Sequence, residues 1–183
     1  MGRGARLPYD QRVRRLSLVV CVAVGACGVT DFDIDQSVME QRIPGSPLPG
    51  PLALLFPIPL DVNISAKIKE METGPIDSVT LKSLTLSITS TGVESGDTDD
   101  WSFVDEIDVF VKSNKSGTTL PRVEIANISN PGAVQTLMFT VDGDVDINPY
   151  VNEGSTVEGE SSGTAPADEV TYDGKAVFTV HPL

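Results

Sequence analysis

Apolar side chains recur at every second position through most of this chain after residue 60. In the segment 60–68, Leu, Val, Ile, Ala and Ile alternate with Asp, Asn, Ser and Lys. Comparable runs lie at 79–88, 107–112, 121–128, 134–147 and 170–180. A period of two places alternate side chains on opposite faces of a β-strand. Seven or eight such strands, with turn residues between them and no convincing amphipathic helix, predict an all-β protein built as a single antiparallel β-sandwich of the Ig-like kind.

The segment 79–88 changes parity partway along. Val79 and Leu81 share one parity, whereas Leu84, Leu86 and Ile88 share the other. One extra residue in a strand restores a common face, so a β-bulge is expected near Lys82-Ser83.

Three further local features follow from composition. The acidic, glycine-containing stretch 90–102 and the Gly/Ser/Thr-rich stretch 152–168 are expected to be loops. Asp173-Gly174 lies between two apolar runs, and Asp-Gly at such a place is typical of a two-residue hairpin turn.

The first 28 residues have a different character. Five arginines precede an uncharged apolar run from Leu16 to Ala26, and Val24-Gly25-Ala26 leads into Cys27. A charged segment, a short apolar segment and small residues at a processing site are the layout of an export signal. The apolar run is shorter than the ~20 residues that a membrane-spanning helix requires.

This layout resembles a bacterial lipoprotein precursor, with Val24-Gly25-Ala26 before Cys27 in the place of the lipobox. The resemblance covers residues 1–28 only. It implies that the preceding segment is removed, that the Cys27 sulfur carries a diacylglyceryl group, and that a further acyl chain such as palmitate modifies the new amino terminus. Two or more acyl chains anchor a protein stably in a bilayer. An ordinary cleaved signal peptide with an incidental cysteine is the alternative.

The expected organisation therefore has three parts. Residues 1–26 are the signal peptide, residues 27–56 form a lipid-anchored tether with a short strand at Phe32 and Ile34 and a Pro/Gly-rich stretch, and residues 57–183 form the β-sandwich domain. The expected location is the bacterial cell envelope, at the outer membrane, with the lipid bilayer as a partner through acylated Cys27.

The net charge of the chain limits the classes of partner that it can bind. Five of the 13 basic residues and one of the 26 acidic residues precede Cys27, which leaves 8 basic and 25 acidic side chains and a formal net charge of −17. This balance disfavours nucleic acid and anionic headgroups, and it attracts divalent cations or basic partners. Cys21 leaves with the signal and Cys27 is acylated, so the mature domain has no disulfide.

Two acidic stretches contain candidate Ca²⁺ ligands. Asp142, Asp144 and Asp146 alternate, and Glu153 lies eleven residues after Asp142, as in an EF-hand loop, but Ile147 replaces the glycine required at the sixth position. Strand spacing would instead put the three aspartates on one solvated face, and this interpretation is favoured.

The second stretch consists of Glu94, Asp97, Asp99, Asp100, Asp105, Glu106 and Asp108, with Trp101 among them. Such carboxylates can surround a cation, although charge runs are more often simply solvated. A single Trp in a β-domain is more often a core anchor than a platform for a sugar, so Trp101 is expected in the core.

No catalytic arrangement stands out. His181 is the only histidine, and neither a Gly-x-Ser-x-Gly elbow nor a His-Glu-x-x-His motif occurs. Paired carboxylates of a hydrolase are a distant third possibility. The chain is therefore expected to be a membrane-anchored, non-enzymatic structural or binding protein without a cofactor, and its protein or glycan partner is open. The alternative is a Ca²⁺-dependent carbohydrate-binding or adhesion module.

Overall fold

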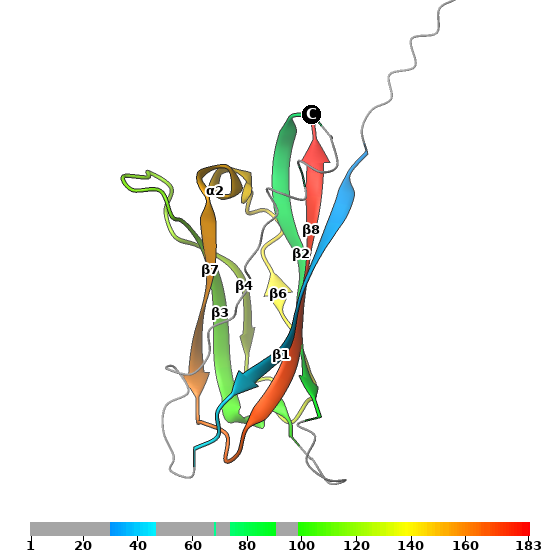
Figure 1. The fold of residues 1–183 in the computed structure, drawn as a ribbon, viewed down its shortest axis with the longest axis vertical. Coiled ribbons are helices and arrows are strands. Elements are labelled where there is room, and N and C mark those ends of the chain that lie inside the picture. Colours follow the sequence, from blue (N-terminus) through cyan, green and yellow to red (C-terminus); the bar gives the residue numbers. More distant parts are fainter. Residues whose placement is uncertain (1–29, 47–67, 69–73, 91–98) are drawn as a thin grey trace, which may run out of the picture.

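Two antiparallel four-stranded sheets pack face to face in the computed structural model, which describes residues 30–46, 68, 74–90 and 99–183 (Figure 1). The first sheet has the order β1-β8-β2-β5 and the second β6-β4-β3-β7. The strands are β1 (Phe32–Ile43), β2 (Ile76–Thr89), β3 (Val104–Ser113), β4 (Val123–Ser129), β5 (Thr136–Met138), β6 (Thr140–Val141), β7 (Ser155–Gly163) and β8 (Val170–Pro182). This arrangement confirms the all-β sandwich.

Besides Ile68, which is helical, the described chain contains two short helical segments: the 3₁₀ turn η2 (Trp101–Phe103) and the helix α2 (Asn148–Glu153). Within the described ranges, no helix is both long enough and apolar enough to cross a membrane.

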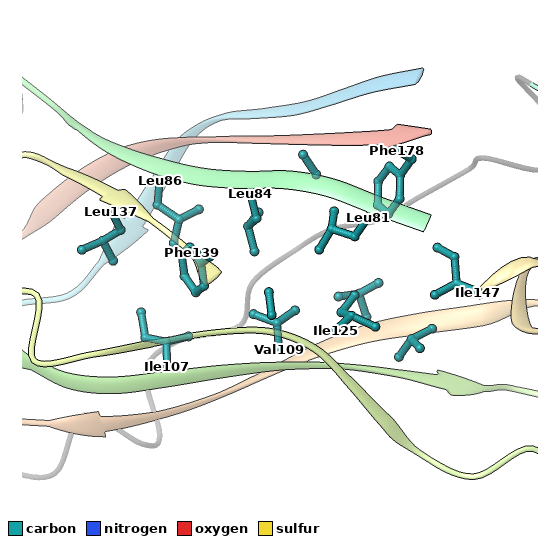
Figure 2. Close-up of a cluster of buried hydrophobic side chains, with 14 of the residues drawn as sticks. Leu81, Leu84, Leu86, Ile107, Val109, Ile125, Leu137, Phe139, Ile147 and Phe178 are labelled. Atoms are coloured by element: carbon teal, nitrogen blue, oxygen red, sulfur yellow. The ribbon is translucent and has the colours of Figure 1, made fainter. Parts of the chain in front are cut away.

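The hydrophobic core lies between the sheets. In Figure 2, Leu84 and Leu86 of β2 face Ile107 and Val109 of β3, and all four side chains are buried. Removing such apolar surface from water is the main favourable term in folding. Inward side chains of both sheets therefore hold the sandwich together, as the alternation predicts.

The bulge expected in β2 is present. The register of β2 against β8 shifts between Leu81 and Ser83, so Val79 and Leu81 share the buried face with Leu84 and Leu86. The parity change in the sequence is thus the direct signature of one extra residue in the strand.

The hairpin expected at Asp173-Gly174 is wrong. β8 continues through both residues, and Gly174 lies between Val38 of β1 and Leu86 of β2. A Cβ on Gly174 would lie 2.8 Å from Val38 Cγ2 and 3.1 Å from Leu86 Cδ2. The glycine therefore admits neighbouring side chains, and it does not turn the chain.

The loop expected over 152–168 is also wrong in its middle. Residues Ser155–Gly163 form β7, which pairs with β3 along its whole length. Val157 is the one buried apolar side chain of this strand. Backbone pairing with β3 rather than an apolar face makes this segment a strand, and composition does not reveal such pairing.

The amino-terminal part of the domain differs from the expected tether. β1 spans twelve residues and pairs with β8, so the sandwich includes residues 32–43. A register shift between Val38 and Gln41 moves Ile43 onto the same buried face as Ile34 and hides the alternation. The signal segment, Cys27 and most of the strand expected at 60–69 lie outside the described residues. Ile68 is described, and it is helical rather than extended and packs against the core.

Candidate functional site: the acidic face of the second sheet

The row Asp142, Asp144 and Asp146 is not a strand face, because β6 ends at Val141 and a turn follows. Asp142 Oδ1 accepts a hydrogen bond from the Asp144 amide at 3.1 Å. Asp146 Oδ1 accepts from the amides of Val79 at 3.0 Å and Asn148 at 2.9 Å. Short Asp side chains commonly bond backbone N–H groups two residues on, which favours turns. Two of the three carboxylates are therefore occupied with backbone amides.

Glu153, the fourth member of the proposed EF-hand spacing, also has protein partners. It accepts hydrogen bonds from Thr118 Oγ1 at 2.6 Å, Ser113 Oγ at 2.7 Å and Lys115 Nζ at 3.0 Å. These bonds, led by the one from Thr118, lower the pKa of Glu153 to about 2. The carboxylate thus ties the chain after β3 to the end of α2.

The second acidic stretch divides between two places. Glu94 and Asp97 lie outside the described residues. Asp100 caps η2 by accepting from the Ser102 amide at 2.9 Å, and its pKa is lowered mainly by hydrogen bonding to Ser102. Glu106 and Asp108 belong to β3. Among the described residues, no three His, Cys, Asp or Glu side chains are grouped so that they could hold a metal ion.

Trp101 is fully buried, as expected of a core anchor. Its Nε1 donates to the Gln135 carbonyl at 3.3 Å, and its ring meets the Tyr172 ring edge-on with centroids 5.7 Å apart. Burial also raises the pKa of Tyr172 to about 12. A Trp enclosed in this way has no face for stacking on a sugar.

His181 lies near the end of β8, and its Nδ1 is 3.0 Å from Asp31 Oδ2. The pair joins the end of β8 to the residue before β1. Its evident role is to hold the two strand ends together.

Five carboxylates lie on the outward side of β4, β3 and β7. We call this group the acidic face; it consists of Glu106, Asp108, Glu124, Glu158 and Glu160. Alternation produces it, since Ile107, Val109 and Val111 of β3 are buried and the residues between them point outward.

Charges on the acidic face are unevenly balanced. Asp108 is opposite Glu160 in the register, and like charges directly opposite each other are destabilising. Burial, followed by Glu106, Glu124 and Glu160, raises the pKa of Asp108. Arg122 opposes this effect in part, so the face carries more negative than positive charge around Asp108.

Cations balance the other end of the face. Arg122 stacks over the Phe110 ring at 3.4 Å and forms ion pairs with Glu158 and Glu160. Lys112 pairs with Glu158. The acidic face thus has two cations for five carboxylates, and both cations lie toward one end of the strands.

Two of these carboxylates, Glu106 and Asp108, belong to the acidic stretch expected from the sequence, whereas the other three were not predicted. Glu158 and Glu160 alternate with Val157 and Gly159 in a segment interpreted as loop. That short alternation is the one sequence pattern that could have indicated a strand there. Only pairing with β3 brings these residues beside Asp108.

Comparisons with known proteins add little to this description. No protein-family model and no curated protein sequence matches the chain. Among solved structures, a chain of Desmodium yellow mottle tymovirus is similar at a TM-score of 0.23 and 12% identity, over 100% of this chain and 97% of that one. A likeness at that level carries no argument about fold or function, so the class of protein stands on its own strand order: an antiparallel β-sandwich.

Proposed function

We propose that this chain is a lipid-anchored protein of the bacterial envelope whose β-sandwich is a non-catalytic structural or binding module. The observation that carries the proposal is the order of the first 28 residues: arginines, an apolar run, and Val24-Gly25-Ala26 before Cys27. A diacylated cysteine would hold the protein permanently at a membrane surface. The strongly acidic domain would stay soluble above that surface.

The position of β1 indicates how the anchored domain would be oriented on the membrane. Residues 28–31 are the whole spacer between Cys27 and Phe32, and a chain of that length spans at most about 17 Å. Phe32 pairs with Val180, so the anchored end also carries the carboxyl terminus and α2 (Figure 1). β2 is fourteen residues long, which corresponds to about 46 Å. The turn between β4 and β5 would therefore lie far from the bilayer, and the acidic face would stand roughly upright on it.

A second function, Ca²⁺-dependent carbohydrate binding or adhesion, ranks below the first. Asp142 and Asp146 accept hydrogen bonds from backbone amides, and Trp101 is enclosed. A thermal melt with and without Ca²⁺ tests it, because a ligand that binds only the folded state raises the melting temperature. A clear rise with Ca²⁺ would move this function into first place.

Mass spectrometry of the membrane fraction tests the anchor. We expect a mature chain that begins at acylated Cys27, and release or stalled processing with Cys27→Ser. Cys21→Ser is the matched control, because Cys21 lies in the segment to be removed, and this variant should be acylated normally. A mature chain that starts elsewhere with unmodified Cys27 would overturn the proposal.

The orientation has its own test. Fluorophores are placed on Leu183→Cys, at the exposed carboxyl terminus, and on Ala133→Cys, at the opposite end of the sandwich. Quenchers carried by lipid headgroups should dim the first label strongly and the second hardly at all. Equal quenching would contradict the short spacer.

A further inference from the structure

Among the described strands, β7 has the longest edge of the second sheet that no other described strand pairs with. β7 pairs with β3 on one side, and no described strand lies on its other side. The opposite edge of the same sheet is β6, which has only two residues. An unpaired edge presents a row of N–H and C=O groups that can pair with another strand.

The direction of those groups follows from the hydrogen bonds at the two ends of β7. Asn114 donates to the Gly154 carbonyl at 2.8 Å, and the Thr164 amide donates to the Phe103 carbonyl at 2.9 Å. Even-numbered residues of this strand therefore direct their backbone groups toward β3. Because direction alternates along a strand, Val157, Gly159 and Ser161 direct theirs outward.

The outer edge of β7 lacks the features that usually prevent an edge strand from pairing with another chain. In the first sheet, the edge strand β1 is interrupted by a register shift between Val38 and Gln41, and Glu40 there has a φ of 53°. Bulges, lysines and prolines commonly prevent edge-to-edge pairing. β7 contains neither lysine nor proline, and its pairing with β3 is regular from Ser155 to Ser162.

Charge selects the kind of strand that fits. A second copy in the antiparallel register centred on Gly159 would place Glu158 opposite Glu160 of that copy, and like charges so placed repel. Glu160 already lies opposite Asp108 of β3. Glu158 and Glu160 already pair with Lys112 and Arg122, but the acidic face as a whole has five carboxylates against these two cations. A strand with Lys or Arg at alternate positions would therefore add positive charge on the outward side, where negative charge is in excess.

We propose that the outer edge of β7 binds an extended segment of a partner protein, with Lys or Arg at every second position, as an additional antiparallel strand. Main-chain hydrogen bonds to Val157, Gly159 and Ser161 would supply affinity, and the acidic face would select basic side chains. The inference rests on the proposed function in one respect, since it names the partner class of a binding module.

The test uses the full chain in detergent and three synthetic peptides of seven residues. One alternates Lys and Val, one alternates Glu and Val, and one has the lysines of the first with proline in place of valine. Isothermal calorimetry should detect only the first peptide, with affinity that falls as salt rises. Amide exchange at Val157, Gly159 and Ser161 should slow when that peptide binds.

Two variants separate backbone pairing from charge. Gly159→Pro removes an outward N–H without removing a bond to β3, and proline is tolerated at such edge positions; binding should weaken at least tenfold. Gly143→Pro, in the turn after β6, is its control and should bind normally. Glu160→Gln should weaken binding about two- to fivefold. Its charge-matched control is Asp144→Asn, which lies in the turn outside the acidic face.

Several outcomes overturn the inference. Equal binding of the proline peptide would mean attraction by charge alone. Amides at 157, 159 and 161 that are protected before peptide is added would mean that another part of the chain already pairs with this edge. A dimer abolished by Gly159→Pro would make a second copy the occupant. In each case acylation of Cys27 is measured separately, so the anchor proposal stands or fails independently.

Discussion

β8 and β7 are both strands of one sandwich, yet their sequences indicate this to very different degrees. β8 lies between β1 and β2 and carries an unbroken series of inward residues at even positions from Val170 to Val180. β7 lies at an edge, and Val157 is its single buried apolar residue. A strand with partners on both sides must fill space on its inner face, whereas an edge strand depends chiefly on one ladder of hydrogen bonds.

The difference between β8 and β7 also explains two of the errors in the expected strands. In β8, Asp173-Gly174 suggested a turn, although a two-residue turn would have paired Tyr172 with Lys175 and put Phe178 on the opposite face from Tyr172. The even-numbered series already argued for continuity. In β7, Gly, Ser and Thr suggested a loop, and nothing local contradicted that interpretation.

The largest effect is expected at Gly174. Gly174→Val should destabilise the fold by about 2–3 kcal/mol, because the new side chain must displace Val38 and Leu86 in a close-packed interior. Gly143→Val is the control, since no atom lies within 4 Å of a Cβ built there, and it should cost less than about 0.5 kcal/mol. Urea unfolding measures both. Equal losses would mean that β8 is not packed between β1 and β2 as described.

Truncation of one valine in each strand tests the difference in burial. Val180 is fully buried in β8, and Val180→Ala should cost about 2 kcal/mol. Val157 of β7 is 9% exposed, and Val157→Ala should cost about 1 kcal/mol. Chemical denaturation of the two variants side by side gives the ratio of their losses in unfolding free energy. A greater loss at Val157 would make β7 part of the central core and reverse the comparison.

The turn after β6 shows how a tertiary contact distinguishes neighbouring residues of one type. Asp146→Ala should cost about 1–2 kcal/mol, because it leaves the Val79 and Asn148 amides without their acceptor. Asp144→Ala should change stability by less than about 0.5 kcal/mol, as is usual for exposed substitutions. Thermal melts distinguish them. Loss of stability at Asp144 alone would contradict the turn.

The smallest effects are expected from titration, and they have opposite signs. The pKa of Glu153 falls from 4.5 to about 2 on folding, so its stabilising contribution is complete above pH 4.5 and is lost as pH falls toward 2. Glu153→Gln should therefore reduce the loss of stability in that window. Melts between pH 2 and 6 provide the measurement, and an unchanged pH profile would contradict the network around Glu153.

Asp108 has the reverse behaviour because its pKa is raised in the folded state. Its ionised form opposes folding above the folded pKa, and the penalty is relieved as pH falls through that value. At neutral pH, Asp108→Asn should stabilise the protein by about 0.5 kcal/mol, since Glu160 would no longer face a like charge. Destabilisation by this variant would mean that the Asp108 carboxylate has a favourable partner.

For the candidate site, two of the five carboxylates of the acidic face could be singled out from the sequence. Glu106 and Asp108 were identified as members of an acidic stretch of the sequence, and Trp101 was correctly expected in the core. Glu158 and Glu160 were not identified, because their place beside Asp108 depends on pairing between strands more than forty residues apart. The aspartates at 142–146 were expected on a strand, and hydrogen bonds to distant and local amides put them in a turn instead.

The amino-acid order by itself determined the all-β class, the bulge in β2, the buried faces of β2 and β3 and the acidic character of the domain. Each follows from the period of the strand or from side-chain charge, and both are local properties. Tertiary structure alone decided that the strand expected at Phe32 and Ile34 continues to Ile43, that residues 155–163 are a strand, that Gly174 is packed between two neighbours, and that five carboxylates share one face. These features depend on which backbone groups and side chains meet across the sheets, and such contacts join residues far apart in the chain.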